Sequence, residues 1–118
     1  MAEGSTSLSA LRVALAGAEK AAAETRLFDV RELALPLYDP ALEPPAAVLE
    51  LAREIERADA MIWSTPLYHG AMSGSFKNAL DWLQVLSDSA LPYLSEKPVG
   101  LIATAGGAQG MQAINSME

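Results

Sequence analysis

Residues 65–82 read Thr65-Pro-Leu-Tyr-His-Gly-Ala-Met-Ser-Gly-Ser-Phe-Lys-Asn-Ala-Leu-Asp-Trp82, and this stretch decides the fold. It follows the apolar residues 60–63, which predict a buried strand over residues 60–64. It continues with Phe76, Leu80 and Leu83 at helical spacing, which predicts a helix over residues 73–86. A buried strand therefore runs into a loop rich in proline, tyrosine and glycine, and this loop opens a helix. In parallel α/β sheets, ligands bind beyond the carboxyl ends of the strands, where such loops lie.

The rest of the chain alternates between helical and strand patterns. Apolar spacing predicts helices over residues 8–23, with Ser7 as N-cap, and from Pro45 onward, and a last helix begins near Met111. Strands are predicted over residues 25–30 and 99–103, the second followed by a glycine-rich loop over 104–110. The helix after Pro45 is expected to bury Val48, Leu51, Ala52 and Ile55. This alternation predicts an open, mostly parallel sheet that helices cover on both faces.

Composition narrows the class of protein. The 118 residues suit a single domain, residues 1–118, and 51% are hydrophobic, which is typical of a globular chain. Eight basic against fifteen acidic side chains give a net charge of −7, which favours neither nucleic acid nor an anionic membrane as a partner. With no cysteine and one histidine, we expect no disulfide and no metal site. No apolar run approaches the ~20 residues of a membrane span, and no secretion signal is recognisable, so we expect a cytoplasmic protein.

The 65–82 stretch resembles the motif of the NADPH-dependent FMN reductases, whose loop reads Ser/Thr-Pro-x-Tyr-Asn/His-Gly and continues into Lys-Asn-Ala-Leu-Asp-Trp. The resemblance implies a flavodoxin-like, doubly wound parallel sheet in a three-layer αβα arrangement. It also implies FMN as cofactor, NADPH or NADH as co-substrate, a small-molecule electron acceptor, and a homodimer or homotetramer. By this resemblance the chain covers the middle of a longer family member.

The loop after the strand at 60–64 is the first candidate site. Pro66 fixes the turn, Tyr68 offers a flat apolar face, and Gly70 allows a positive φ or close backbone approach to a ligand. The alternative interpretation is a tight strand-to-helix turn with one aromatic ring packed on the core. The continuation into residues 77–82 favours the flavin site. The resemblance then assigns flavin contacts to Pro66, Leu67, Tyr68, His69 and Gly70.

The glycine-rich loop over residues 104–110 is the second candidate site. Its backbone N–H groups are suited to the pyrimidine end of a flavin, where they would stabilise negative charge on the reduced ring. The alternative interpretation is an ordinary strand-to-helix turn. The residues assigned to the cofactor here are Thr104, Ala105, Gly106, Gly107 and Gln109.

The N-terminal hydroxyl-rich segment is the third candidate site. Hydroxyl and N–H groups at the start of a helix are suited to a phosphate, which would reconcile an acidic protein with an anionic cofactor. The family usually has an arginine in this loop, and this chain has none there. A frayed terminus with a serine cap is the alternative. The candidate phosphate contacts are Ser5, Ser7 and Ser9.

We assign no catalytic residue. Hydride transfer to a flavin needs no side-chain base, so we expect His69 to donate a hydrogen bond rather than to transfer a proton. Lys77 and Asp81 are four residues apart, which predicts an exposed ion pair within one helix, with pairing across a subunit interface as the alternative. Trp82 is assigned to the core or to an interface.

The expected activity is transfer of electrons from NAD(P)H through FMN to a second acceptor, such as a quinone, an azo compound, a metal oxyanion or free flavin. The alternatives are a flavin-binding electron carrier or regulatory module without NAD(P)H turnover, and an incomplete piece that binds nothing. Only three strands are readable, near Thr25, Ala60 and Val99. In the flavodoxin-like order 2-1-3-4-5, the first strand lies between the second and the third. We therefore expect a sheet without its first and last strands.

Overall fold

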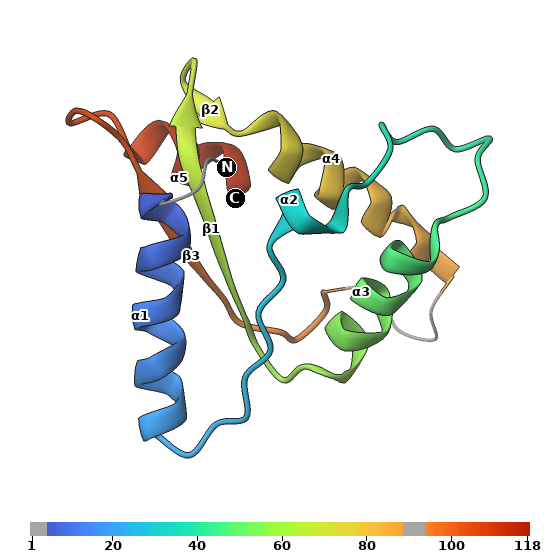
Figure 1. Ribbon diagram of the computed structural model, residues 1–118, viewed down its shortest axis with the longest axis horizontal. Coiled ribbons are helices and arrows are strands. Elements are labelled where there is room, and N and C mark those ends of the chain that lie inside the picture. The colour runs from blue at the N-terminus through green and yellow to red at the C-terminus, as the bar shows by residue number, and fades with distance from the viewer. Residues whose placement is uncertain (1–4, 89–93) are drawn as a thin grey trace.

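The computed structural model describes residues 5–88 and 94–118, arranged as helices around a three-stranded sheet (Figure 1). The sheet has the order β2-β1-β3, in which β1 and β3 are parallel, with Met61 opposite Val99 and Pro66 opposite Thr104. The short β2 is antiparallel to the end of β1. The elements in chain order are α1 (Thr6–Lys20), α2 (Val30–Leu33), α3 (Ala46–Arg57), β1 (Met61–Tyr68), β2 (Ala71–Met72), α4 (Gly74–Trp82), the 3₁₀ helix η1 (Leu83–Asp88), β3 (Val99–Thr104) and α5 (Met111–Met117).

Helices lie on both faces of β1. The Ser64 hydroxyl donates a hydrogen bond of 2.8 Å to the carbonyl oxygen of Ser7 in α1. The next side chain, Thr65, accepts one of 2.9 Å from the backbone N–H of Ser73, at the start of α4. Since successive side chains of a strand point to opposite faces, α1 and α4 cover opposite faces of the sheet. This confirms the predicted α/β fold class, an open sheet between helical layers.

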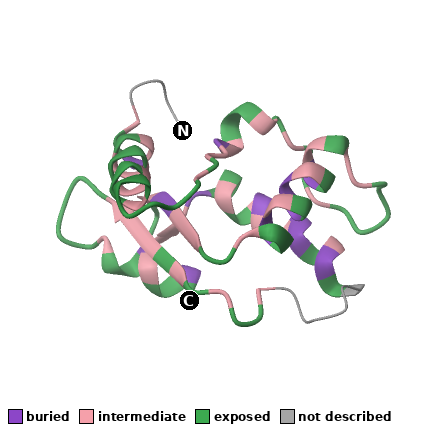
Figure 2. Ribbon diagram, turned by 90° about the horizontal axis from the view of Figure 1, so that it is seen from below, coloured by how far each residue is buried: buried purple, intermediate pink, exposed green. Residues whose placement is uncertain are grey.

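The hydrophobic core lies on the α4 side of the sheet, where α3 meets η1 (Figure 2). Pro45 is the N-cap of α3, close to the predicted start of this helix. The apolar stripe of α3 packs against Leu83 and Leu86, with Met61 of β1 and Phe28 at its margin. All four residues that the helical spacing assigned to the core are buried: Val48, Leu51, Ala52 and Ile55.

The prediction of a strand over residues 25–30 is wrong. These residues form no strand; Val30 begins the short helix α2, and Asp29 is its N-cap. A strand needs a hydrogen-bonded neighbour, and in the described part of the chain none lies beside this segment. Side chains hold it instead. Arg26 forms ion pairs with Glu50 and, at 2.8 Å, with Glu54 of α3, and its hydrogen bond with Glu50 raises the pKa of Arg26.

The strand predicted over residues 60–64 is confirmed, but it is longer and less buried than expected. It continues to Tyr68, because Thr65 and Pro66 pair with Ala103 and Thr104 of β3 and Leu67 pairs with Met72 of β2. Residues 65–72 are therefore a hairpin rather than a loop. Of the strand's residues only Ser64 and Thr65 are buried. No described strand pairs with residues 61–66 on the edge opposite β3.

The remaining elements follow the prediction with shifted ends. α1 begins at Thr6 with Ser5, not Ser7, as its N-cap, and it ends at Lys20. The helix predicted over residues 73–86 is an α-helix to Trp82 and then a 3₁₀ helix. β3 and α5 lie where they were expected. Among the residues that the structure describes, no helix is long and apolar enough to span a membrane.

Candidate functional site

The three segments predicted to bind the cofactor meet at the carboxyl edge of the parallel strands. The hairpin extends from the end of β1, and the glycine-rich loop follows Thr104 at the end of β3. The first turn of α1 joins them, because the Ser7 Oγ atom lies 2.6 Å from the Thr104 Oγ1 atom. Figure 1 shows the same convergence, with the start of α1, the β1–β2 turn and the loop before α5 at one end of the sheet. This is the edge at which open α/β sheets bind ligands.

A two-residue turn of His69 and Gly70 closes the hairpin. Their φ angles are 49° and 78°, the positive pair that tight hairpin turns require. A Cβ atom on Gly70 would lie 3.1 Å from the Oε1 atom of Gln112, so a larger residue would be strained by its φ and would displace the Gln112 side chain. Tyr68 precedes the turn and is 53% exposed, so its ring does not pack into the core of this chain. The interpretation as a turn with an aromatic ring on the core is therefore wrong for Tyr68.

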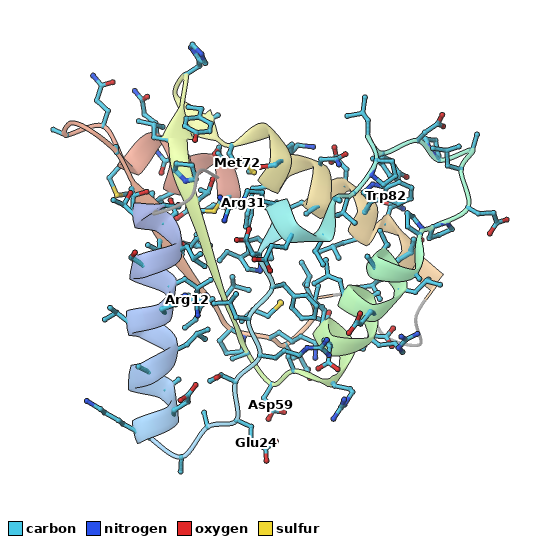
Figure 3. The ribbon with its side chains drawn as sticks, viewed as in Figure 1. Arg12, Glu24, Arg31, Asp59, Met72 and Trp82 are labelled. Atoms are coloured by element: carbon cyan, nitrogen blue, oxygen red, sulfur yellow. The ribbon has the colours of Figure 1, made fainter. Side chains whose placement is uncertain are left out.

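The hairpin is closed at its base by side-chain hydrogen bonds. The buried Thr65 hydroxyl accepts from the N–H of Ser73 at 2.9 Å and donates to the carbonyl oxygen of Pro66 at 3.0 Å. The Ser73 hydroxyl in turn accepts from the N–H of Phe76 at 3.3 Å and caps α4. Further along, the N–H of Met72 donates to the Ser116 hydroxyl of α5 at 2.9 Å, and Figure 3 labels Met72 at this end of the sheet. The path of residues 66–72 is thus held by β1, α4 and α5 together.

The glycine-rich loop presents its backbone to open space. Residues 105–109 are all exposed, and a Cβ atom added at Gly106 or Gly107 would meet no atom within 4 Å. The loop leads into α5, whose first turn follows Gly110. A planar group at this edge could approach both the exposed ring of Tyr68 and the peptide groups of the loop. The residues present therefore fit a flavin, although neither loop contains a charged side chain that would select one.

The three serines of the N-terminal segment lie in different environments. Ser5 accepts from the N–H of Leu8 at 3.4 Å, and the exposed Ser9 donates to the carbonyl oxygen of Ser5 at 3.1 Å. Ser7 is 1% exposed, and its hydroxyl is paired with Thr104. Ser5 therefore caps the helix, as the alternative interpretation of this segment expected of a serine. A phosphate-binding role for these three residues stays a prediction.

The Lys-Asn-Ala-Leu-Asp-Trp part of the motif holds another segment in place. The side-chain N–H groups of Asn78 and Trp82 both donate to the carbonyl oxygen of Pro36, at 2.9 and 2.8 Å. Asn78 also accepts from the N–H of Tyr38 at 2.7 Å, and the Tyr38 ring meets the Trp82 ring edge-on at 5.1 Å. Trp82, labelled in Figure 3, is 1% exposed and so belongs to the core of this chain. Lys77 and Asp81 form the predicted ion pair within the helix.

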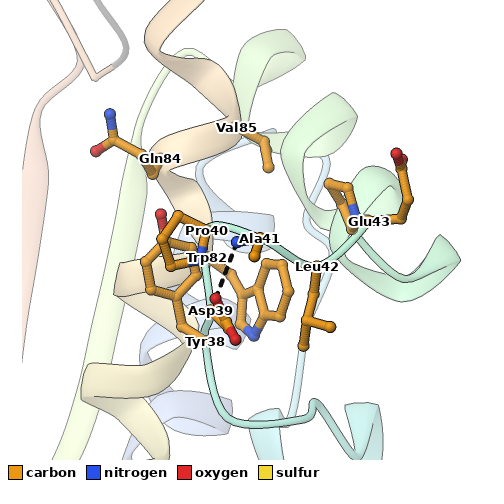
Figure 4. A pocket seen from close by; sticks show the side chains of 10 residues that line it. Tyr38, Asp39, Pro40, Ala41, Leu42, Glu43, Trp82, Gln84 and Val85 are labelled. Carbon is orange, nitrogen blue, oxygen red and sulfur yellow. Dashed lines mark hydrogen bonds between the residues drawn. The ribbon is translucent and has the colours of Figure 1, made fainter.

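A separate open pocket of about 380 Å³ lies beside this segment (Figure 4). Its walls come from the chain around Pro40 and from Trp82, Gln84 and Val85 at the end of α4 and in η1. None of the residues predicted to contact the flavin lines it. Among the described residues, no group of three or more acidic or histidine side chains is placed to hold a metal ion.

Sequence reasoning missed the residues that hold the hairpin and the segment around Pro36. It gives Thr65 no role in the predicted loop and treats Asn78 only as part of the motif. It assigns no role to Ser116 of α5, whose hydroxyl accepts from the N–H of Met72, or to Gln112, whose side chain lies beside Gly70. Gln112 and Ser116 are four residues apart, which puts them on one face of a helix and is a weak signal for a shared contact surface. Only the fold shows that this face of α5 lies against the hairpin.

Comparison with known proteins agrees with this architecture. The family model of the NADPH-dependent FMN reductases matches residues 1–117. The chain is 37% identical over 95 residues to an NADPH-dependent FMN reductase, ArsH, of Acidithiobacillus ferrooxidans, a match that covers 80% of this chain and 39% of the relative. It is 40% identical over 97 residues to an NADPH azoreductase of a Bacillus species, covering 80% of this chain and 51% of the relative. It is 38% identical over 80 residues to a quinone reductase of Escherichia coli, covering 64% and 41%.

The matched region spans between about two fifths and one half of the length of these curated relatives. The match with the family model nevertheless extends over nearly all of this chain, from α1 through the hairpin to α5. It confirms the resemblance that the 65–82 stretch indicated. The chain belongs to the NADPH-dependent FMN reductase family.

Proposed function

We propose that this protein binds FMN at the carboxyl edge of the β1–β3 pair and works as an NAD(P)H-dependent oxidoreductase. The observation that carries the proposal is the convergence of the hairpin, the glycine-rich loop and the start of α1 at one edge. When bound, FMN would supply the redox chemistry by accepting a hydride and passing electrons on. The chain's own residues bind and orient the ring.

Each of the three segments has its own part in the proposed site. The hairpin residues Pro66–Gly70 lie along the ring, with the exposed side chain of Tyr68 as an apolar surface. The N–H groups of residues 104–109, of which residues 105–109 are exposed, donate hydrogen bonds to the pyrimidine end and stabilise negative charge on the reduced ring. The start of α1, with Ser5 and Ser9, faces the phosphate, which the positive end of the helix dipole favours.

The proposed co-substrate is NADPH or NADH, and the proposed acceptor is a small molecule. Relatives are named as an azoreductase and a quinone reductase, which supports azo compounds and quinones as the acceptor classes to assay first. Both classes are planar and conjugated, so they suit an exposed aromatic ring next to a flavin. We further propose a cytoplasmic homodimer or homotetramer.

Binding is tested by loading the intact protein with FMN and measuring the dissociation constant by flavin fluorescence. Wild type should bind one FMN per chain, and denaturation should release FMN rather than FAD. Gly70→Val should abolish binding, because valine at φ 78° is strained and its side chain meets Gln112. Lys77→Ala is the matched control, since the exposed Lys77 pairs with Asp81 within α4 and its loss should leave affinity unchanged. Unchanged affinity in Gly70→Val would contradict the assigned site.

Turnover is tested separately on the FMN-loaded protein. Steady oxidation of NADPH or NADH with a quinone or an azo dye present would support the oxidoreductase. Stoichiometric FMN without NAD(P)H oxidation would instead identify an electron carrier or regulatory module. Absence of flavin even after FMN has been added would contradict both functions.

A further inference from the structure

We propose that Thr65 is a positioning residue, whose hydroxyl fixes the hairpin of residues 66–72 in the shape that receives the flavin ring. The inference rests on the proposed function, because the hairpin is part of the proposed flavin site. Thr65 is 0% exposed, so its side chain cannot touch a ligand that arrives from solvent. Its effect on the site must therefore pass through the hairpin.

The Thr65 hydroxyl both donates and accepts a hydrogen bond. Its oxygen accepts from the N–H of Ser73 at 2.9 Å, and its proton is donated to the carbonyl oxygen of Pro66 at 3.0 Å. These two partners are the first residue of the hairpin segment and the residue that follows its last. The Thr65 side chain therefore closes the loop between Thr65 and Ser73, which are eight positions apart.

The hairpin's own backbone pairing is short. Its antiparallel ladder consists of two residue pairs, Leu67 with Met72 and Tyr68 with Ala71. Two-stranded hairpins are marginally stable by themselves, so contacts to other elements decide their shape. Thr65 supplies such a contact from a fixed position, because its backbone pairs with Ala103 of β3.

Loss of the hydroxyl would leave a buried donor without a partner. Ser73 is 2% exposed, and its N–H has the Thr65 oxygen as its acceptor. A buried unpaired N–H is unfavourable, so Ser73 would move toward water. Ser73 is also the N-cap of α4, and its movement would release the end of the hairpin and loosen the first turn of this helix.

The test compares three variants of the intact protein: Thr65→Val, which removes the hydroxyl and keeps the volume, Thr65→Ser, which keeps the hydroxyl, and Lys77→Ala, which removes an exposed side chain of α4 that pairs with Asp81. Dissociation constants are measured for FMN and for riboflavin. We expect Thr65→Val to weaken the binding of both flavins by the same factor, about tenfold, because the ring end of the site is altered and the phosphate end is not. Thr65→Ser and Lys77→Ala should stay within about threefold of wild type.

A folded Thr65→Val variant with wild-type affinity for both flavins would overturn the proposal. Loss of FMN affinity alone would overturn it too, because it would place the effect at the phosphate. Amide hydrogen exchange of Ser73 in wild type and Thr65→Ser keeps the proposal testable if the valine variant does not fold. Protection of the Ser73 amide in both proteins supports closure of the hairpin by the hydroxyl, and fast exchange of this amide in wild type contradicts it. If wild type binds no FMN, the proposed function fails, while Ser73 exchange still decides whether Thr65 closes the hairpin.

Discussion

The Oγ atom of Ser7 lies 2.6 Å from the Oγ1 atom of Thr104, across a separation of 97 positions in the sequence. Ser7 lies in the first turn of α1, and Thr104 is the last residue of β3. Ser64 of β1 adds a third hydroxyl by donating to the carbonyl oxygen of Ser7 at 2.8 Å. These hydroxyls join the segment predicted to bind phosphate to the loop predicted to bind the flavin ring. The distance between the two ends of the proposed site is therefore set inside the protein.

We predict that the Ser7 and Thr104 hydroxyls stabilise the fold as a unit. Ser7→Ala and Thr104→Val should each lower the free energy of unfolding of the intact protein by about 0.5–1.5 kcal/mol, because each breaks a hydrogen bond that involves a buried residue. The double variant should lose clearly less than the sum, since the bond is broken only once. Urea unfolding measures all three, with Ser9→Ala as an exposed control. Additive losses would show that the two hydroxyls do not interact.

The hydrogen bonds of Asn78 lead to a prediction for the segment around Pro36. Asn78→Ala should free residues 36–44, because it removes a bond to the carbonyl oxygen of Pro36 and one from the N–H of Tyr38. Limited proteolysis should then cut within these residues several times faster than in wild type. Asp81→Ala is the control on the same helix, and it should change stability by at most about 0.5 kcal/mol, since the pair with Lys77 is exposed. Equal proteolysis rates in wild type and Asn78→Ala would contradict the assigned role.

The turn position of His69 allows a sharp test of its chemical role. Its φ of 49° is in the left-handed region that asparagine adopts readily, so His69→Asn should keep the hairpin and a side-chain donor. We expect this variant to retain most NAD(P)H oxidation by the FMN-loaded protein. His69→Val should weaken FMN binding instead, because a β-branched residue is strained at this φ. A loss of several orders of magnitude in His69→Asn with FMN still bound would show that His69 transfers a proton.

The open edge of β1 yields a prediction for the polypeptide of residues 1–118 taken by itself. Residues 61–66 pair with no described strand on the edge opposite β3, and residues 25–29 pair with none on either edge. Met61, Ile62 and Trp63 are only partly buried. Backbone groups without partners along this edge are unfavourable, and native domains have only about 5–15 kcal/mol of stability. We expect this polypeptide to associate or to unfold without a cooperative transition in urea. A cooperative, monomeric unfolding transition together with one bound FMN would contradict the prediction.

The sequence by itself determined the features that depend on near neighbours in the chain. The apolar stripe of α3 has a helical period, and all four of its predicted core residues are buried. Gly70 and the motif that follows it indicate the turn, the helix and the family from local residues alone. The order of strand, turn and helix in residues 61–82 can be predicted for the same reason, since periodicity and turn residues are local features of a few neighbouring positions.

Tertiary structure decided what depends on residues far apart. Residues 25–30 alternate like a strand, but a strand exists only beside a hydrogen-bonded neighbour, and the described chain provides none there. Ser7 lies in the segment predicted to bind phosphate, and only the tertiary structure places its hydroxyl against that of Thr104, 97 positions away. The hydrogen bond from the N–H of Met72 to the Ser116 hydroxyl of α5 has no local pattern either. A hydrogen bond forms only where donor and acceptor lie about 3 Å apart in space. For residues far apart in the chain, no local spacing in the sequence encodes that distance.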